Sequence, residues 1–229
     1  MGWFSKFFNS SIGKKFFMAL TGSFLIIFLI IHFIGNLTLF FGPDAFNGYV
    51  KTLDVIKPLI RVIEVVLLTA FVLHIFNGIK LWLENKRSQG GSFMSKYKVN
   101  ASGENSSFSS RTTFVTGSIV FIFLVLHLGT FFWRFNVHDP VGLADTHQYY
   151  NIVIEFFQIW WYVILYVIAV LLLGFHLNHG FQSAFQTFGW NNNKYFPFVK
   201  KLGTVYAIIM ALGFASMPIY FFFFYGGNL

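Results

Sequence analysis

The chain has 229 residues, of which 56% are hydrophobic and only 10% are charged. A soluble globular domain has about 25% charged residues, so this composition favours an integral membrane protein over a soluble enzyme. The sequence has no cysteine, which excludes disulfides, thiolate-bound iron–sulfur clusters and covalently attached c-type haem within this chain. We interpret the net charge of +8 as a signal of membrane orientation and not of nucleic-acid binding.

Five apolar segments are long enough to cross a bilayer, which takes about 20 helical residues. Each should be a helix, because irregular backbone exposed to lipid would leave its polar groups unpaired. They lie near 16–41, 58–83, 113–134, 152–182 and 202–225. The expected fold is therefore one all-α membrane domain over residues 1–229, whose first helix is not a cleaved signal peptide. Residues 84–112, rich in Lys, Ser, Gly and Asn, are expected to form a solvent-exposed loop.

Lysine and arginine are divided unevenly between the two expected sides of the membrane. The N-terminal tail, the stretch 80–111 and the stretch 194–201 together hold 12, whereas the opposite side holds 4 (Lys51, Lys57, Arg61 and Arg134). Cytoplasmic loops carry the excess of positive residues. This bias predicts a cytoplasmic N-terminus, a cytoplasmic loop at 84–112 and a C-terminus on the far side.

Four histidines lie inside four of the apolar segments, one in each: His32, His74, His127 and His176. An ionisable side chain at membrane depth is energetically expensive and indicates a functional site. His32 follows Lys15 by 17 residues and His127 follows Arg111 by 16. At 1.5 Å per residue, both lie about 25 Å from the cytoplasmic anchor, in the outer half.

The other two histidines belong to the cytoplasmic half. His74 comes 6 residues before Lys80, and His176 lies late in an inward-running segment. The histidines at equal depth are therefore His32 with His127 and His74 with His176. Two axial imidazoles suit a haem iron, and without cysteine only a noncovalent b-type haem is expected. A single zinc ion would need all its ligands in one tetrahedron, and copper is disfavoured by the absence of Cys or Met ligands.

Some alternatives remain open at these positions. A single membrane histidine can also be a packing residue or part of a proton relay. His179, three residues after His176, is a rival ligand. His176 is preferred because Gly180 follows it by four residues, as Gly78 follows His74. A glycine one turn from the ligand would let a macrocycle or another helix approach closely. His138 and His147 are expected in a solvated loop.

The pattern resembles the membrane cytochrome b subunit of succinate:quinone oxidoreductases, and more narrowly the single-subunit di-haem type of the cytochrome b558 family. The resemblance covers nearly the whole chain. It rests on the order of four helices with histidine followed by one without. The motifs that carry it are Leu29-Ile-Ile-His32, Leu73-His74-Ile-Phe-Asn-Gly78, Leu126-His127-Leu and Gly174-Phe-His176-Leu-Asn-His-Gly180.

This resemblance implies a bundle of five transmembrane helices that holds two b haems in the bacterial cytoplasmic membrane. It implies partners on the cytoplasmic side, namely a flavoprotein subunit and an iron–sulfur subunit. Electrons would pass to the haem of His74 and His176, then to the haem of His32 and His127, and to a quinone, expected to be menaquinone. The chain itself would have no dicarboxylate active site.

One position departs from part of that family. Some di-haem fumarate reductases carry a Glu two residues before the fourth ligand, implicated in proton transfer, and this chain has Gly174 there. Glu64, Arg61 and Asn36 lie toward the outer side and are candidates for quinone protonation, although each also suits a solvated interface. Two other functions stay open. One is the cytochrome b anchor of another enzyme, such as a hydrogenase or formate dehydrogenase, and the other is a histidine-relay proton transporter.

Overall fold

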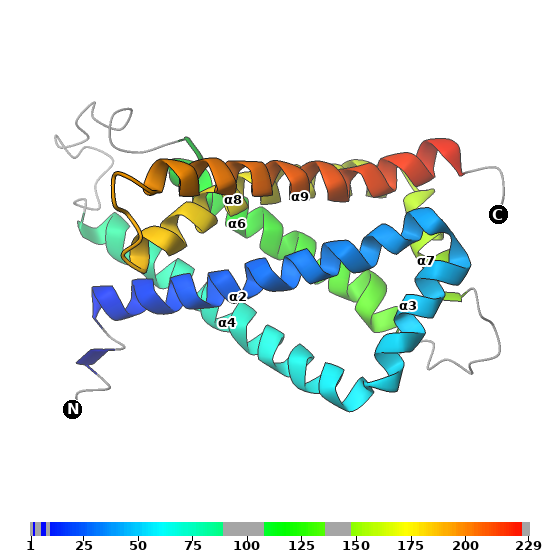
Figure 1. The fold of residues 1–229 in the computed structure, drawn as a ribbon, viewed down its shortest axis with the longest axis horizontal. Helices are drawn as coiled ribbons and strands as arrows, with labels where there is room; N and C mark the ends of the chain where they lie inside the picture. The colour runs from blue at the N-terminus through cyan, green and yellow to red at the C-terminus, as the bar shows by residue number, and fades with distance from the viewer. Residues whose placement is uncertain (1, 3–5, 8–9, 89–107, 136–147, 226–229) are drawn as a thin grey trace.

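The computed structural model describes residues 2, 6–7, 10–88, 108–135 and 148–225, and every element within these ranges is a helix (Figure 1). The five long helices are α2 (Ser11–Leu37), α4 (Lys57–Ser88), α6 (Phe108–His127), α8 (Trp160–Thr187) and α9 (Phe196–Phe224). A 3₁₀ turn, η1 (Thr38–Phe41), extends α2, and a π-helical turn, η2 (Leu128–Phe132), extends α6. All five are long and apolar enough to cross a membrane. The expected all-helical class with five long apolar helices is confirmed.

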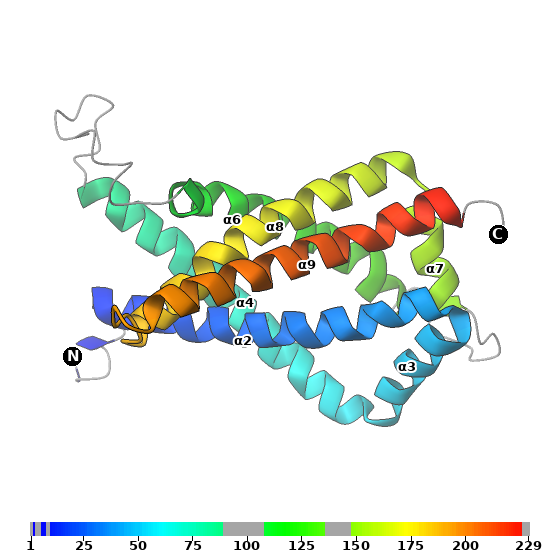
Figure 2. The ribbon, with the colours of Figure 1, turned by 45° about the horizontal axis from the view of Figure 1, so that its top comes forward.

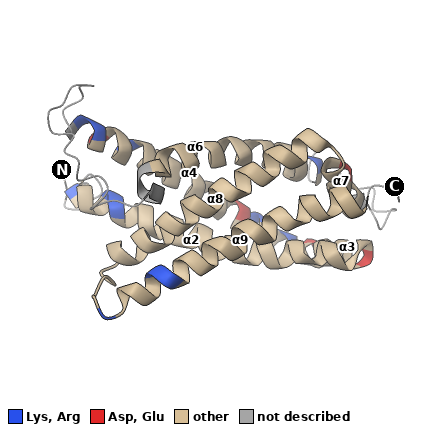
Figure 3. Cartoon of the chain, turned by 90° about the horizontal axis from the view of Figure 1, so that it is seen from above, with Lys and Arg blue, Asp and Glu red and all other residues tan. Residues whose placement is uncertain are grey.

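The five long helices run side by side, so the bundle has two ends (Figures 1 and 2). At the first end, α2 begins, α4 ends, α8 ends and α9 begins. At the second end lie η1, the start of α8, the last turn of α9 and two short helices, α3 (Pro43–Val55) and α7 (Gln148–Phe157). Lysine and arginine residues, drawn in blue, gather at the first end (Figure 3). Its described acidic residue is Glu84, whereas Asp44, Asp54 and Glu155 lie on α3 and α7.

The segment expected as one helix over 152–182 is divided in the structure. α7 ends at Phe157 and α8 begins at Trp160, after an extended Ile159 with φ −87° and ψ 106°. The break is held in place because Gln158 Nε2 donates to the carbonyl oxygen of Phe221 in α9 at 2.8 Å. In the expected loop 84–112, residues 84–88 continue α4, α6 begins at Phe108, and residues 89–107 lie outside the described part of the chain.

Small residues let α8 and α9 pack along most of their length. A Cβ placed on Gly174 would lie 2.8 Å from Cβ of Ala211, and one placed on Gly203 would lie 2.8 Å from the ring of Phe181. Without a hydrophobic driving force between helices in lipid, such close backbone approach is a main source of stability. Gly174, the position that departs from some di-haem fumarate reductases, is therefore a contact point of α8 with α9.

α2 and α4 are joined at the first end and separate toward the second (Figure 1). Lys14, only 8% exposed, forms an ion pair with Glu84 whose Nζ–Oε1 distance is 2.5 Å. α4 also contacts α6 near this end, where Trp82 stacks on Phe114 with ring centres 4.0 Å apart.

At the second end, α3 is fixed to α7 by one buried amide. Asn47, 2% exposed, accepts a hydrogen bond through Oδ1 from the backbone nitrogen of Tyr150 at 3.0 Å. Tyr150 N–H belongs to the first turn of α7, where backbone donors have no partner inside the helix. Asn47 thus caps α7 through a residue that is 103 positions away in sequence.

Candidate functional site

His74 of α4 and His176 of α8 lie side by side near the first end. We call them the first-end pair. Their ring centres are 6.3 Å apart and their planes are inclined at 72°. These are the two histidines that sequence depth assigned to the same half of the membrane.

His32 of α2 and His127 of α6 form the second-end pair. Their ring centres are 5.8 Å apart and their planes are nearly perpendicular, at 86°. His32 follows Gly22, which touches the first-end pair, by ten residues. The two pairs are therefore about 15 Å apart along the bundle. One tetrahedral ion cannot bind histidines that far apart, since metal–imidazole bonds are about 2 Å long.

The spacing within each pair suits one metal ion between two imidazoles. With metal–nitrogen bonds of about 2 Å, the two coordinating nitrogens are about 4 Å apart and the ring centres about 6 Å. The observed separations of 6.3 and 5.8 Å agree with this value. Among the described residues, no group of three His, Cys, Asp or Glu side chains could hold a metal ion. Within the described part of the chain, each pair therefore offers two imidazoles, the number that a bis-histidine haem iron would take from the protein.

Thr21 of α2 orients the ring of His74. Its Oγ1 lies 3.2 Å from His74 Nδ1 and donates its own proton to the carbonyl oxygen of Phe17 at 2.7 Å. A hydroxyl has one proton, so Oγ1 accepts from Nδ1–H of the imidazole. This tautomer leaves a lone pair on Nε2 for a metal, and such hydrogen bonds fix the orientation of metal-binding histidines.

Two glycines that sequence reasoning did not single out form the walls behind the first-end pair. A Cβ on Gly22 of α2 would lie 3.2 Å from Cε1 of His74, and one on Gly117 of α6 would lie 3.1 Å from Cε1 of His176. Both imidazoles therefore rest on helix backbone where another residue would push them away. Nδ1 of His176 is buried.

The sequence did carry a signal for these glycines. Each belongs to a Thr-Gly-Ser triplet, at 21–23 and at 116–118, and each precedes the histidine of its own helix by ten residues. α2 and α6 thus each supply one glycine to the first-end pair and one histidine to the second-end pair. The role of this repeat can be recognised only once it is known that α2 faces His74 and α6 faces His176.

The second-end pair is enclosed by aromatic rings. Phe28 stacks on His32 with ring centres 5.3 Å apart, and Phe214 of α9 lies 5.9 Å from the same ring. His127 contacts Phe123 at 5.6 Å, and its buried Nδ1 has no hydrogen-bond partner among the described residues. The π-helical turn η2 begins directly after His127, and such turns are frequent at functional sites.

Other predicted candidates have separate places. His179 Nε2 lies 3.2 Å from Ser183 Oγ, one turn along the same helix, so the structure gives this ring a local partner. A Cβ on Gly78 would meet the terminal methyl of Met18 at 3.3 Å, whereas one on Gly180 would meet nothing within 4 Å. Neither glycine contacts a histidine. His138 and His147 lie outside the described residues.

Of the three residues considered for quinone protonation, Arg61 and Glu64 form an ion pair with an Nη1–Oε2 distance of 2.6 Å. Asn36 stays close to the second-end pair, with Nδ2 2.8 Å from the carbonyl oxygen of His32 and 3.4 Å from its Nε2. Nε2 of His32 therefore faces a polar side chain, in contrast to the apolar rings around the rest of this imidazole.

Comparison with known proteins gives one match. Residues 16–103 match the model of the family described as succinate dehydrogenase/fumarate reductase transmembrane subunit. The chain has no match among the curated proteins or the solved structures. The matched residues contain α4 and all of α2 after its first five residues, with His32 of the second-end pair and His74 of the first-end pair.

Proposed function

We propose that this chain, which matches the model of the succinate dehydrogenase/fumarate reductase transmembrane subunit family over residues 16–103, is a member of that family and the di-haem cytochrome b anchor of such a complex. It passes electrons between the iron–sulfur subunit and a membrane quinone, expected to be menaquinone. The observation that carries the proposal is the pairing of four histidines from four helices at two levels, with ring centres 6.3 and 5.8 Å apart.

The residues present fit b-type haem. The first-end pair would hold one haem through His74 and His176, and the second-end pair would hold the other through His32 and His127. Bound haem supplies reversible one-electron transfer. The chain supplies the tautomer and orientation of His74 through Thr21, the backbone walls at Gly22 and Gly117, and a setting among helices that excludes water.

The first end of the bundle is the side we assign to the cytoplasm and to the catalytic partners. It carries Lys14, Lys15, Lys80, Lys86, Arg87, Lys194, Lys200 and Lys201 among its described residues. Such an excess marks the cytoplasmic side. The first-end pair is then the cofactor site closer to the flavoprotein and iron–sulfur subunits, and the second-end pair is the one closer to the far side.

Purification of the tagged chain from its own membranes tests this function. We expect two noncovalent haems per polypeptide, co-purification of a flavoprotein and an iron–sulfur protein, and reduction of the haem by succinate. A folded but colourless preparation would contradict the proposal. Co-purification with hydrogenase or formate dehydrogenase subunits would support the assignment as a cytochrome b anchor but would assign the chain to a different enzyme. Proton transport by the purified chain without any partner would favour the histidine-relay transporter.

A further inference from the structure

Among the described elements, the first four long helices repeat one arrangement twice. A long helix, a short helix at the second end and a long helix that runs back occur as α2, α3 and α4, and again as α6, α7 and α8 (Figures 1 and 2). Each candidate metal centre takes one histidine from each half. The second-end pair comes from the first helix of each half, and the first-end pair comes from the last helix of each half.

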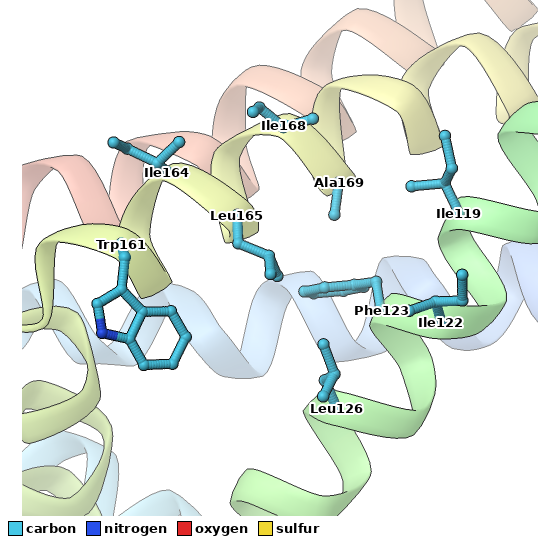
Figure 4. Close-up of a pocket in the computed structure, with 9 residues that line it drawn as sticks. All are labelled: Ile119, Ile122, Phe123, Leu126, Trp161, Ile164, Leu165, Ile168 and Ala169. Atoms are coloured by element: carbon cyan, nitrogen blue, oxygen red, sulfur yellow. The ribbon is translucent and has the colours of Figure 1, made fainter.

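Two apolar grooves show that the two halves correspond residue by residue. One groove lies between α2 and α4, and the other lies between α6 and α8. A shift of 95 positions, which separates His32 from His127, takes each α2 residue of the first groove onto an α6 residue of the second. A shift of 102 positions, which separates His74 from His176, does the same for α4 and α8. Eight of the nine lining residues labelled in Figure 4 are therefore counterparts of the eight that line the α2–α4 groove.

The same shift of 95 relates two buried threonines, Thr21 of α2 and Thr116 of α6, which are 8% and 5% exposed. Each hydroxyl approaches the carbonyl oxygens three and four residues earlier in its own helix. The oxygen–oxygen distances are 3.2 and 2.7 Å for Thr21 and 3.1 Å for both contacts of Thr116. Bonds of this kind often bend a helix, so each threonine helps to set the direction of the carbonyl groups beside it.

One of these carbonyl groups in each half faces a histidine of the first-end pair. The backbone of Met18 is a hydrogen-bond partner of the His74 ring, and the backbone of Thr113 is a hydrogen-bond partner of the His176 ring. In each half, that residue lies three positions before the buried threonine. N–H groups inside a helix already bond to the preceding turn, so the carbonyl oxygen is the group that accepts from the imidazole.

We propose that Thr116 is a positioning residue of the first-end pair, whose hydroxyl orients the Thr113 carbonyl so that it accepts Nδ1–H of His176 and leaves Nε2 for the metal. This inference rests on the proposed function. An acceptor at Nδ1 fixes both the tautomer and the ring orientation of a metal-binding histidine. Without the hydroxyl, the direction of the carbonyl is set by the helix alone, and the ring is held less firmly.

The first test compares two threonines in the purified full chain. Thr116→Val removes the hydroxyl and keeps the branched shape. We expect the first-end haem to bind about tenfold more weakly and to change its EPR spectrum, which depends on the angle between the two imidazole planes, while the second-end haem keeps its spectrum. Thr116→Ser should restore both properties. Thr69→Val is the matched control, because the exposed Thr69 on α4 makes the same kind of bond, to the carbonyl oxygen of Val65 at 2.8 Å, and this variant should behave as wild type.

An unchanged first-end haem in Thr116→Val would overturn the role of Thr116, and so would equal changes in Thr69→Val. If Thr116→Val does not fold, Thr116→Ala removes the same hydroxyl without adding a methyl group. If the wild-type chain carries no haem, the proposed function fails, and nitrogen NMR of the histidine-labelled chain then decides the role of Thr116. The proton of His176 should lie on Nδ1 in the wild type and on either nitrogen in the variant, and one unchanged tautomer would contradict the inference.

Discussion

Under the proposed di-haem function, replacing Gly22 by leucine should remove the haem proposed at the first-end pair and leave the haem proposed at the second-end pair in place. Even the first added atom is too close, because a Cβ on Gly22 would lie 3.2 Å from Cε1 of His74. Favourable contacts between carbon atoms lie at about 3.5–4.0 Å, so the ring must move by about 0.3–0.8 Å for alanine alone. Leucine adds three more carbons along the same direction.

A displacement of this size matters because binding sites need their groups within about 0.5 Å and 10–20° of the productive geometry. Gly22→Ala should therefore weaken haem binding at the first-end pair, and Gly22→Leu should abolish it. Glycine to alanine by itself favours a helix by about 1 kcal/mol, so a loss of haem would not come from weaker helix formation.

Gly78→Ala is the matched control for this substitution. Its new Cβ would meet the terminal methyl of Met18 at 3.3 Å, nearly the same distance, but a methionine end moves aside easily. The assay is the haem-to-protein ratio and the reduced-minus-oxidised spectrum of purified protein. Wild-type haem content in Gly22→Leu would refute the argument, as would equal losses in Gly22→Ala and Gly78→Ala.

Three further outcomes follow from single contacts. Thr21→Val should weaken first-end haem binding about 10–100-fold through loss of the orienting hydrogen bond, with Thr21→Ser retaining it; equal haem titrations for the two variants would count against this. Asn47→Ala should lower the free energy of unfolding in detergent by about 1–3 kcal/mol, because Tyr150 N–H loses its acceptor; Asn47→Asp should lose less, and an unchanged unfolding midpoint for Asn47→Ala would exclude the cap. Gly174→Glu should destabilise the fold by about 1–3 kcal/mol through overpacking against Ala211, and a variant as stable as wild type would show that this contact is not tight.

Helix number, and which histidines lie close together, follow from simple features of the sequence. Five long, predominantly apolar segments can cross lipid only as helices in a chain of this pattern, and the fixed rise per residue of a helix converts sequence position into depth. The short helices α3 and α7 were not expected, because their stability depends on the contact of Asn47 with Tyr150 across 103 residues. The break between Phe157 and Trp160 depends likewise on Gln158 reaching α9.

The glycines show where sequence reasoning stops. Gly78 and Gly180 were expected to make room beside the ligands, since each lies one turn from a histidine on the same helix. The structure instead puts Gly22 and Gly117 of the facing helices against the imidazoles. Contacts between helices depend on rotation of each helix about its axis, which periodicity alone does not fix in segments that are apolar on nearly every side.

The most direct measurement of the central claim is the spectrum of four single variants, each with one of His32, His74, His127 and His176 replaced by alanine. Reduced-minus-oxidised spectra at low temperature resolve two b haems in one protein when their environments differ. We predict that His74→Ala and His176→Ala lose the same spectral component, and that His32→Ala and His127→Ala lose the other. Loss of a common component from His74→Ala and His32→Ala, or full haem content in any one of the four variants, would contradict the assignment of two bis-histidine haem sites.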